Sequence, residues 1–113
     1  MQTNQAVKAL GALAQETRLA IFRMLVQAGP EGLPAGEIAG RLGLAAPAAS
    51  FHLTQLSHAG LARSRPRGRF VIYSADFGQM NALVAFLTEN CCGGEPCGPV
   101  SVACPPARKG TKR

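Results

Sequence analysis

Along the first half of the chain, the pattern of apolar and polar residues is that of amphipathic helices. The first predicted helix carries apolar side chains at helical spacing, namely Ala6, Val7, Leu10 and Leu13. Further helices are predicted over about residues 16–28 and about residues 35–42. Because proline suits the first turn of a helix, Pro47 is expected to open a fourth helix, which ends at Gly60.

The third and fourth predicted helices are joined by a short turn that contains Gly43, which matches a helix-turn-helix. β-Branched and aromatic residues then crowd residues 70–73, and Pro66-Arg67-Gly68 is a turn signal. We therefore expect a β-hairpin over residues 61–73, with arginines at its tip and on both arms. A hairpin placed directly after a helix-turn-helix is a wing.

A last helix is predicted to begin at Asp76, which with Gln79 resembles a capping box. Its apolar side chains form one seam, made of Met80, Leu83, Val84 and Leu87. This seam is expected to be an interface between two copies of the chain, and burial in the core of a monomer stays open as the alternative. The predicted fold class is mainly α with a small β-hairpin, a dimeric winged helix-turn-helix. Residues 1–90 are expected to form the DNA-binding and dimerisation domain, and residues 91–113 a cysteine-containing ligand loop with a basic tail.

Positive charge is concentrated in two places, although the net charge of the chain is only +6. One cluster consists of Arg63, Arg65, Arg67 and Arg69, and the other of Arg108, Lys109, Lys112 and Arg113. The remaining 4 basic residues are outnumbered by the 6 acidic ones, which leaves a net charge of 4 − 6 = −2 elsewhere. The arginines of the predicted wing are therefore expected to contact nucleic acid, whereas the C-terminal run fits a solvated tail.

Several classes of protein are not supported by the sequence. There is no apolar run long enough for a membrane span and no secretory signal at the N-terminus, so we expect a cytoplasmic protein. We find no phosphate-binding loop, no paired catalytic carboxylates and no Ser/His/Asp arrangement, so an enzyme is not predicted. In a reducing compartment, clustered cysteines more often bind metal or react than form structural disulfides.

Double-stranded DNA is the expected partner, because a helix fits the major groove and a basic wing grips phosphates. The residues predicted to contact it are Pro47, Ser50, His52 and Gln55 on the fourth helix, and Arg65, Arg67 and Arg69 on the wing. The first turn of that helix offers almost no hydrogen-bond donors, so apolar contact with thymine methyl groups is a further means of readout. A structural role for His52, and plain exposure for Gln55, remain open.

Three segments resemble the ArsR/SmtB family of winged-helix repressors. Residues 16–25 (ETRLAIFRML) are similar to its second helix, residues 50–56 (SFHLTQL) with 59–61 (AGL) to its recognition helix, and residues 67–73 to its wing. The resemblance extends from about Leu10 to Leu87. It implies a homodimer, an operator with two half-sites, and repression that a ligand relieves.

Two sensing sites known in that family are absent from this sequence. One arsenic-sensing version carries a Cys-x-Cys pair at the start of the third helix, where this chain has no cysteine between positions 33 and 38. The zinc-sensing version uses aspartate and histidine pairs on the last helix, where this chain has Asp76 and Glu89 but no histidine. The cysteines that follow the last helix instead resemble an arsenite-sensing branch with a C-terminal site.

The 4 cysteines of the chain all lie in its last quarter. Cys91, Cys92 and Cys97 are predicted to converge on one soft ion, with Cys104 as an optional fourth ligand. As(III) or Sb(III), which takes three thiolates, is the expected inducer. Another thiophilic metal such as Cd(II), Zn(II) or Pb(II), and a thiol-redox role for Cys91-Cys92, remain open.

Overall fold

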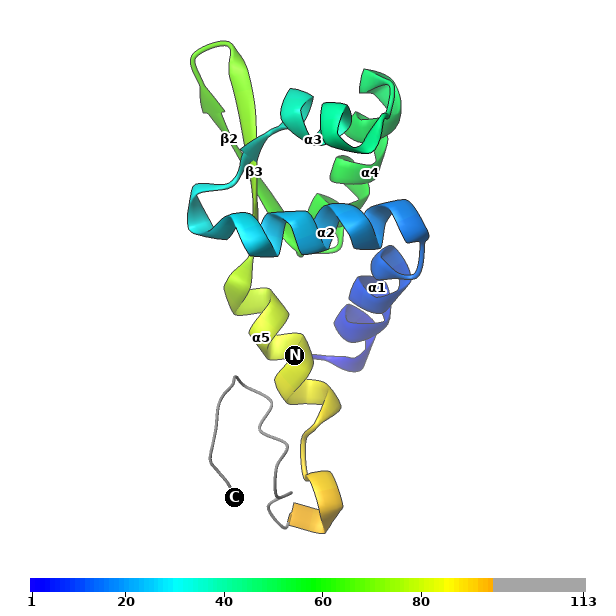
Figure 1. Ribbon diagram of the computed structural model, residues 1–113. Coiled ribbons are helices and arrows are strands. Elements are labelled where there is room, and N and C mark those ends of the chain that lie inside the picture. Colours follow the sequence, from blue (N-terminus) through cyan, green and yellow to red (C-terminus); the bar gives the residue numbers. More distant parts are fainter. Residues whose placement is uncertain (95–113) are drawn as a thin grey trace.

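The structure is a computed structural model and describes residues 1–94. In chain order the elements are α1 (Thr3–Leu13), α2 (Glu16–Ala28), the 3-10 turn η1 (Gly29–Glu31), β1 (Leu33–Pro34), α3 (Ala35–Leu42), α4 (Ala46–His58), β2 (Ala62–Arg67), β3 (Phe70–Ala75), α5 (Phe77–Leu87) and the 3-10 turn η2 (Cys91–Gly94). Helices α3 and α4 and the β2–β3 hairpin form one end of the molecule (Figure 1), and the end of α5 with η2 forms the other. None of the helices within residues 1–94 is long and apolar enough to cross a membrane.

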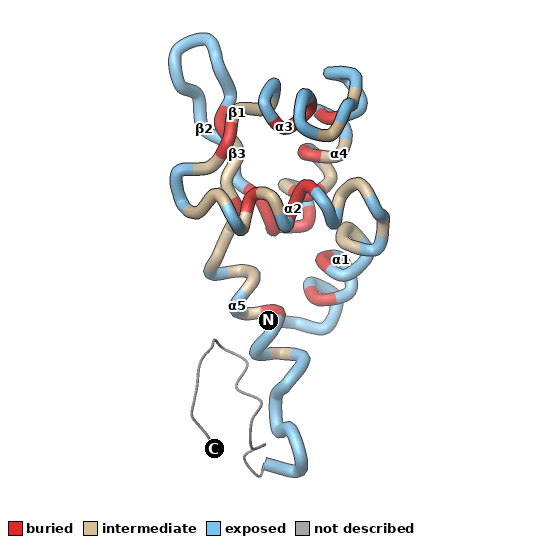
Figure 2. Tube along the Cα trace, viewed as in Figure 1, coloured by how far each residue is buried: buried red, intermediate tan, exposed pale blue. Residues whose placement is uncertain are grey.

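Helix α2 lies at the centre of the molecule and contacts α1, α4 and β3. The core around it contains side chains with no exposed area, which are Ile21, Leu25, Ile38, Leu53, Leu56 and Leu61. Each such side chain contributes about 1.5–3 kcal/mol by leaving water. The buried stretches in Figure 2 gather where α2, α4 and the sheet meet, so the position of α4 is fixed by the core.

The turn between α3 and α4 has the expected helix-turn-helix form. Gly43 follows α3 in the left-handed conformation (φ 65°), and the backbone N–H of Leu44 donates to the carbonyl of Ala39 at 2.9 Å. Helix α4 begins at Ala46, one residue earlier than predicted, and Pro47 still lies in its first turn. Its last residue is His58, so it ends before Gly60.

The wing is confirmed as a hairpin, but its turn lies elsewhere than predicted. Strands β2 and β3 pair in antiparallel fashion from Ala62 opposite Ala75 to Arg67 opposite Phe70, which leaves Gly68 and Arg69 as the turn. Pro66 lies within β2, which tolerates it because β2 is an edge strand. The arginines lie on β2 and at the turn and not on both arms, because β3 is the apolar arm.

A short third strand was not predicted. Strand β1 pairs with β3, so the strand order is β1-β3-β2. Gly32 precedes β1 with a φ of 73°, and a Cβ atom there would lie 2.2 Å from the carbonyl oxygen of Tyr73. Only glycine permits this approach.

Helices α1 and α5 contact each other at the end opposite the wing (Figure 1), and both differ from the predicted burial pattern. In α1 the small side chains of Ala6 and Ala9 face the core, whereas Val7 and Leu10 are 62% and 41% exposed. In α5 the N-cap is confirmed, since Asp76 accepts a hydrogen bond from the backbone N–H of Gln79 at 3.0 Å.

The predicted seam of α5 divides into two parts. Leu83 is buried within the single chain (5% exposed), and Met80 packs against the same core. Val84 and Leu87 are 39% and 57% exposed. The assignment of Leu83 to an interface is therefore corrected, because its side chain is already covered by its own chain.

Candidate functional site

Helix α4 presents a narrow surface that the core holds in place. Ala49, Leu53 and Leu56 are buried beneath it. Of the predicted contact residues, Pro47 and Ser50 are exposed, while His52 and Gln55 are half-buried on the side of the helix. Thr54, a further polar residue of this helix, is exposed, and so is Phe51, which was not among the predicted contacts.

His52 is anchored by a residue that the sequence reading did not single out. The guanidinium Nη1 of Arg18 lies 3.3 Å from Nδ1 of His52, and its Nε donates to the carbonyl of Ala12 at 2.8 Å. Because a guanidinium only donates hydrogen bonds, Nδ1 is the acceptor in this contact, and Nε2 is the other ring nitrogen. Arg18 therefore connects the end of α1, the start of α2 and α4, and leaves His52 one ring nitrogen for an outside partner.

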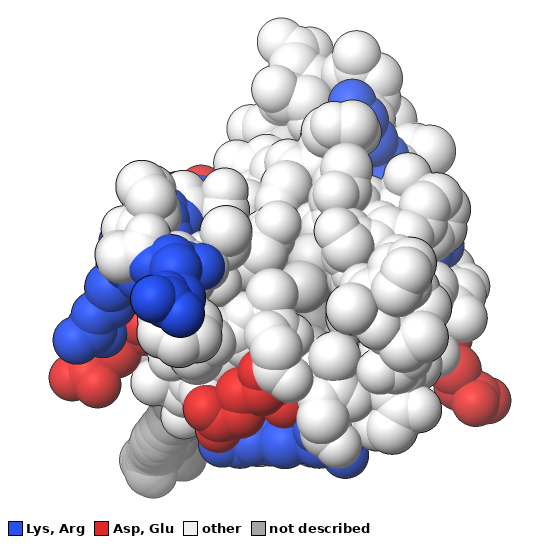
Figure 3. Space-filling model, turned by 90° about the horizontal axis from the view of Figure 1, so that it is seen from above, with Lys and Arg blue, Asp and Glu red and all other residues white. Residues whose placement is uncertain are grey.

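The arginines of the wing form two groups. At its base, Arg63 Nε lies 3.5 Å from a carboxylate oxygen of Asp76, and Nη2 of Arg65 donates to the carbonyl of Glu31 at 2.7 Å. The side chains of Arg67 and Arg69, at the tip, make no hydrogen bond or ion pair within residues 1–94. The view from above the wing and α4 (Figure 3) shows a largely uncharged central face, with basic and acidic side chains around its edges.

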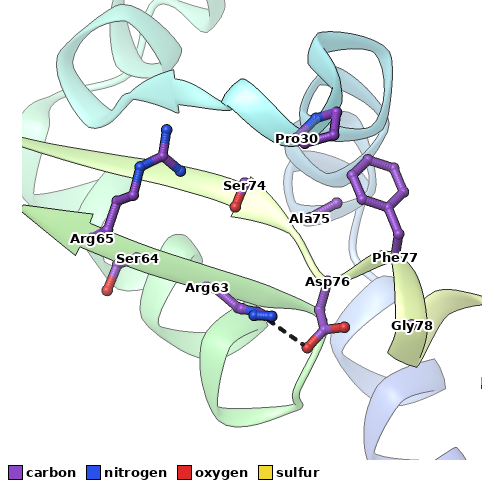
Figure 4. Close-up of a pocket in the computed structure, with 9 residues that line it drawn as sticks. All are labelled: Pro30, Arg63, Ser64, Arg65, Ser74, Ala75, Asp76, Phe77 and Gly78. Carbon is purple, nitrogen blue, oxygen red and sulfur yellow. Dashed lines mark ion pairs between the residues drawn. The ribbon is translucent and has the colours of Figure 1, made fainter.

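A hollow of about 470 Å³ lies beside the base of the wing. Arg63, Arg65 and Ser74 line it from the strands, and Asp76 and Phe77 from the start of α5 (Figure 4). The Arg63–Asp76 contact crosses from β2 to the residue that caps α5. This contact ties the wing to α5 at the end that is farther from the cysteines.

The cysteine turn follows α5 directly. Cys91 and Cys92 are both exposed residues, and their Sγ atoms lie 3.7 Å apart. Asn90 and Cys92 have positive φ angles of 56° and 57°, which side chains other than glycine rarely adopt. The backbone N–H of Cys91 donates to the carbonyl of Thr88 at 2.9 Å, so the turn is hydrogen-bonded to the C-cap residue of α5.

This geometry suits a shared ligand on the two thiols. Two thiolates that bind one ion at about 2.3 Å, the zinc–sulfur bond length, can lie no more than about 4.6 Å apart. The observed 3.7 Å is within this limit. Cys97 and Cys104, the other predicted ligands, lie outside the described residues, and within residues 1–94 no three potential metal ligands cluster.

Comparison with known proteins gives consistent relatives. Residues 13–65 match a family model described as a helix-turn-helix domain. The chain is 35% identical over 88 residues to the HTH-type transcriptional regulator YgaV of Escherichia coli K12, covering 78% of this chain and 87% of that protein.

Solved structures agree with this result. HlyU from Vibrio cholerae N16961 superposes with a TM-score of 0.64 at 33% identity, covering 80% of this chain and 95% of HlyU. The homodimeric winged helix-turn-helix DNA-binding domain Mb0332 of Mycobacterium bovis, described as a possible ArsR-family regulator, gives 0.62 at 26% identity over 84% and 88% of the two chains. With its helix-turn-helix, its wing and these relatives, the chain belongs to the ArsR family of winged helix-turn-helix transcriptional regulators.

Proposed function

We propose that this regulator is a homodimeric repressor that binds operator DNA without ligand and releases it when As(III) or Sb(III) binds its C-terminal cysteines. The observation that carries the proposal is the pair of thiols on Cys91 and Cys92, 3.7 Å apart at the end of α5. Thiolates select soft, thiophilic centres. Arsenite forms three bonds to sulfur, and Cys97 is near enough in sequence to supply the third.

The dimer is supported by apolar side chains that the single chain leaves uncovered. Val7 and Leu10 on α1, and Val84 and Leu87 on α5, are each at least 39% exposed, and the two helices contact each other. Exposed apolar patches mark surfaces that another protein covers. The relative Mb0332 is itself described as homodimeric, which favours a second copy of this chain as the partner.

A route from the cysteines to DNA follows from the hydrogen bonds at the end of α5. Thr88 accepts from the backbone N–H of Cys91 through its carbonyl, and its hydroxyl donates to the carbonyl of Val84 at 2.9 Å. Val84 belongs to the proposed dimer surface. A ligand that reshapes the cysteine turn therefore acts on the interface and, through it, on the spacing of the two α4 helices. A coupling of about 1–3 kcal/mol corresponds to a loss of DNA affinity of about 5- to 150-fold.

The test is a titration of the protein–operator complex, followed by fluorescence anisotropy in the presence of a non-thiol reductant. Arsenite and antimonite should release the DNA, whereas zinc, cadmium and lead should do so weakly or not at all. Cys91→Ser, Cys92→Ser and Cys97→Ser proteins should bind the operator normally and stay bound in arsenite. Cys104→Ser serves as the matched control and should be released like the original chain.

Two outcomes would refute this proposal. Release by cadmium or zinc but not by arsenite would assign the site to another metal, with Cys104 completing the four ligands that zinc prefers. Full arsenite response in the Cys97→Ser protein would show that the trio is wrong.

A thiol-redox sensor is the second candidate, favoured by the proximity of the same two sulfur atoms. Hydrogen peroxide would take two electrons and two protons from the Cys91 and Cys92 thiols, forming one disulfide bond and two water molecules. Release of DNA by peroxide alone, reversed by a reductant and accompanied by a mass decrease of two hydrogens, would favour this candidate. Insensitivity to peroxide with intact arsenite response would exclude it.

A further inference from the structure

The DNA-facing helix carries an exposed aromatic side chain that neither the fold nor the proposed ligand explains. Phe51 is 57% exposed on α4. It stands two residues from both Ala49 and Leu53, which are buried, so it projects from the opposite side of the helix. Leaving a large apolar ring in water is unfavourable, and this position is away from the α1 and α5 surface proposed for the dimer.

The ring is supported by its neighbours and is not merely loose on the surface. Its centroid lies 5.5 Å from that of the His52 ring, with an interplanar angle of 66°, an edge-to-face arrangement. Arg18 in turn anchors Nδ1 of His52. A side chain ordered in this way before binding loses less rotamer entropy when it makes a contact.

The surroundings of Phe51 determine which contact it can make. Ala46, Pro47 and Ala48 precede it on α4, are exposed, and offer no side-chain hydrogen-bond donor. Phosphate groups are charged and make no favourable apolar contact with a phenyl ring. The major groove, by contrast, displays one apolar group, the C5 methyl of thymine. Cytosine lacks this methyl, and guanine and adenine present polar edges at the corresponding place.

We infer that Phe51 is a specificity-determining residue that contacts a thymine methyl group in each half-site of the operator. The inference rests on the DNA-binding part of the proposed function and is independent of arsenite. Helix α4 then reads DNA partly by shape and apolar contact, with Ser50 and the free nitrogen of His52 supplying polar contacts. This division fits the largely uncharged face around α4 in Figure 3.

The experiment begins with the full chain, under reducing conditions and without metal. A preferred binding site is selected from randomised duplexes, and each thymine of that site is then replaced in turn by uracil. This replacement removes only the methyl group and leaves base pairing unchanged. For the original protein, one position per half-site should lose about fourfold in affinity, the effect of exposing one buried methyl group.

The variants assign that methyl group to a side chain. Phe51→Ala should bind the thymine duplex more weakly and should no longer distinguish thymine from uracil at that position. Phe51→Leu should keep part of the difference, and Thr54→Ala, the matched control on the same helix face, should keep all of it. Circular dichroism should show intact helix in each variant, since both positions are exposed.

The results separate failure of the inference from failure of the function. If the original protein selects a site but no uracil replacement weakens binding, the inference is wrong and DNA recognition stands. It is equally wrong if Phe51→Ala retains the full thymine preference. If no duplex is preferred at all, sequence-specific DNA binding itself fails.

Discussion

The two ends of the molecule are held together in very different ways. At the DNA-reading end, α4 rests on fully buried leucines, and Arg18 ties it to α1 and α2. At the other end, residues 84–94 are exposed except for Phe86, which is half-buried. Figure 2 shows this stretch of the tube as almost entirely exposed. The backbone N–H of Cys91 donates to the carbonyl of Thr88, and the hydroxyl of Thr88 donates to the carbonyl of Val84, so these two hydrogen bonds join residues that are close in sequence.

This difference assigns a physical role to each end. A surface fixed by a packed core keeps its contact residues in one arrangement, which sequence-specific binding requires. A segment held by exposed local hydrogen bonds opens and rearranges at low cost in free energy. Under the proposed function, a ligand of the cysteines would act on the sparsely buried end of α5.

The largest effect is expected from a cavity at the DNA-reading end. Leu53→Ala should lower the free energy of unfolding by about 2–5 kcal/mol, because Leu53 is fully buried between α4 and the core. Cys92→Ser, at the exposed end, should change it by less than about 0.5 kcal/mol. Urea unfolding followed by circular dichroism at equal protein concentration measures both. Equal losses would mean that the two ends do not differ in packing.

Glycine and proline residues at the ends of helices explain why some elements were predictable. Helices α2 and α3 have the predicted bounds because Gly29-Pro30 and Gly43 stop them. The hairpin turn was misplaced because Pro66-Arg67-Gly68 is a strong local turn signal. The edge position of β2, which makes Pro66 acceptable within a strand, is a tertiary fact that the local pattern does not contain.

Other features depend on contacts between distant segments. Arg18 and His52 are 34 positions apart, and no periodicity links them. Helices α1 and α5 are apolar on more than one side, so spacing alone could not tell Ala6 from Val7, or Leu83 from Val84. Phe51 was not predicted because the predicted base contacts on this helix are mainly polar side chains. A helix position opposite the buried stripe was the signal that could have identified it.

Replacing Arg18 should loosen the DNA-reading end while leaving the exposed residues of α4 unchanged. Arg18→Met should cost about 1.5–3 kcal/mol of stability, because hydrogen bonds from a charged group to Ala12 and His52 are lost. Affinity for the selected operator should fall more than affinity for random DNA. Arg23→Met is the matched control on the same helix, since Arg23 is exposed, and should change neither. If the two variants had the same stability and the same operator affinity, the anchoring role of Arg18 would be contradicted.

The proposed dimer surface at the exposed end can be tested by placing a charged side chain on it. Val84→Asp should leave the chain folded but monomeric, because an unpaired carboxylate opposes burial between two copies. A monomer contacts only one half-site. Its operator affinity should therefore fall at least about tenfold, an effect no smaller than that of one mismatched base pair. Leu83→Asp should instead unfold the chain, since Leu83 is buried within it. Light scattering that finds a folded Val84→Asp dimer would place the interface elsewhere.

The smallest effect concerns the tip of the wing, where the side chains of Arg67 and Arg69 make no hydrogen bond or ion pair with other residues in the described range 1–94. Arg67→Ala or Arg69→Ala should weaken binding to all duplexes about equally and reduce the slope of log affinity against log salt by about 0.9, the effect of one lost phosphate contact.

Arg63→Ala, at the base, should leave the slope unchanged, because Arg63 pairs with Asp76. The Arg63→Ala protein should lose little stability, since exposed ion pairs contribute at most about 1 kcal/mol. If Arg63→Ala lowered the slope as much as Arg67→Ala, the base would also bind phosphate, and the division between an anchored base and a free tip would no longer hold. A change of sequence preference in Arg67→Ala at constant slope would instead make the tip a reader of bases.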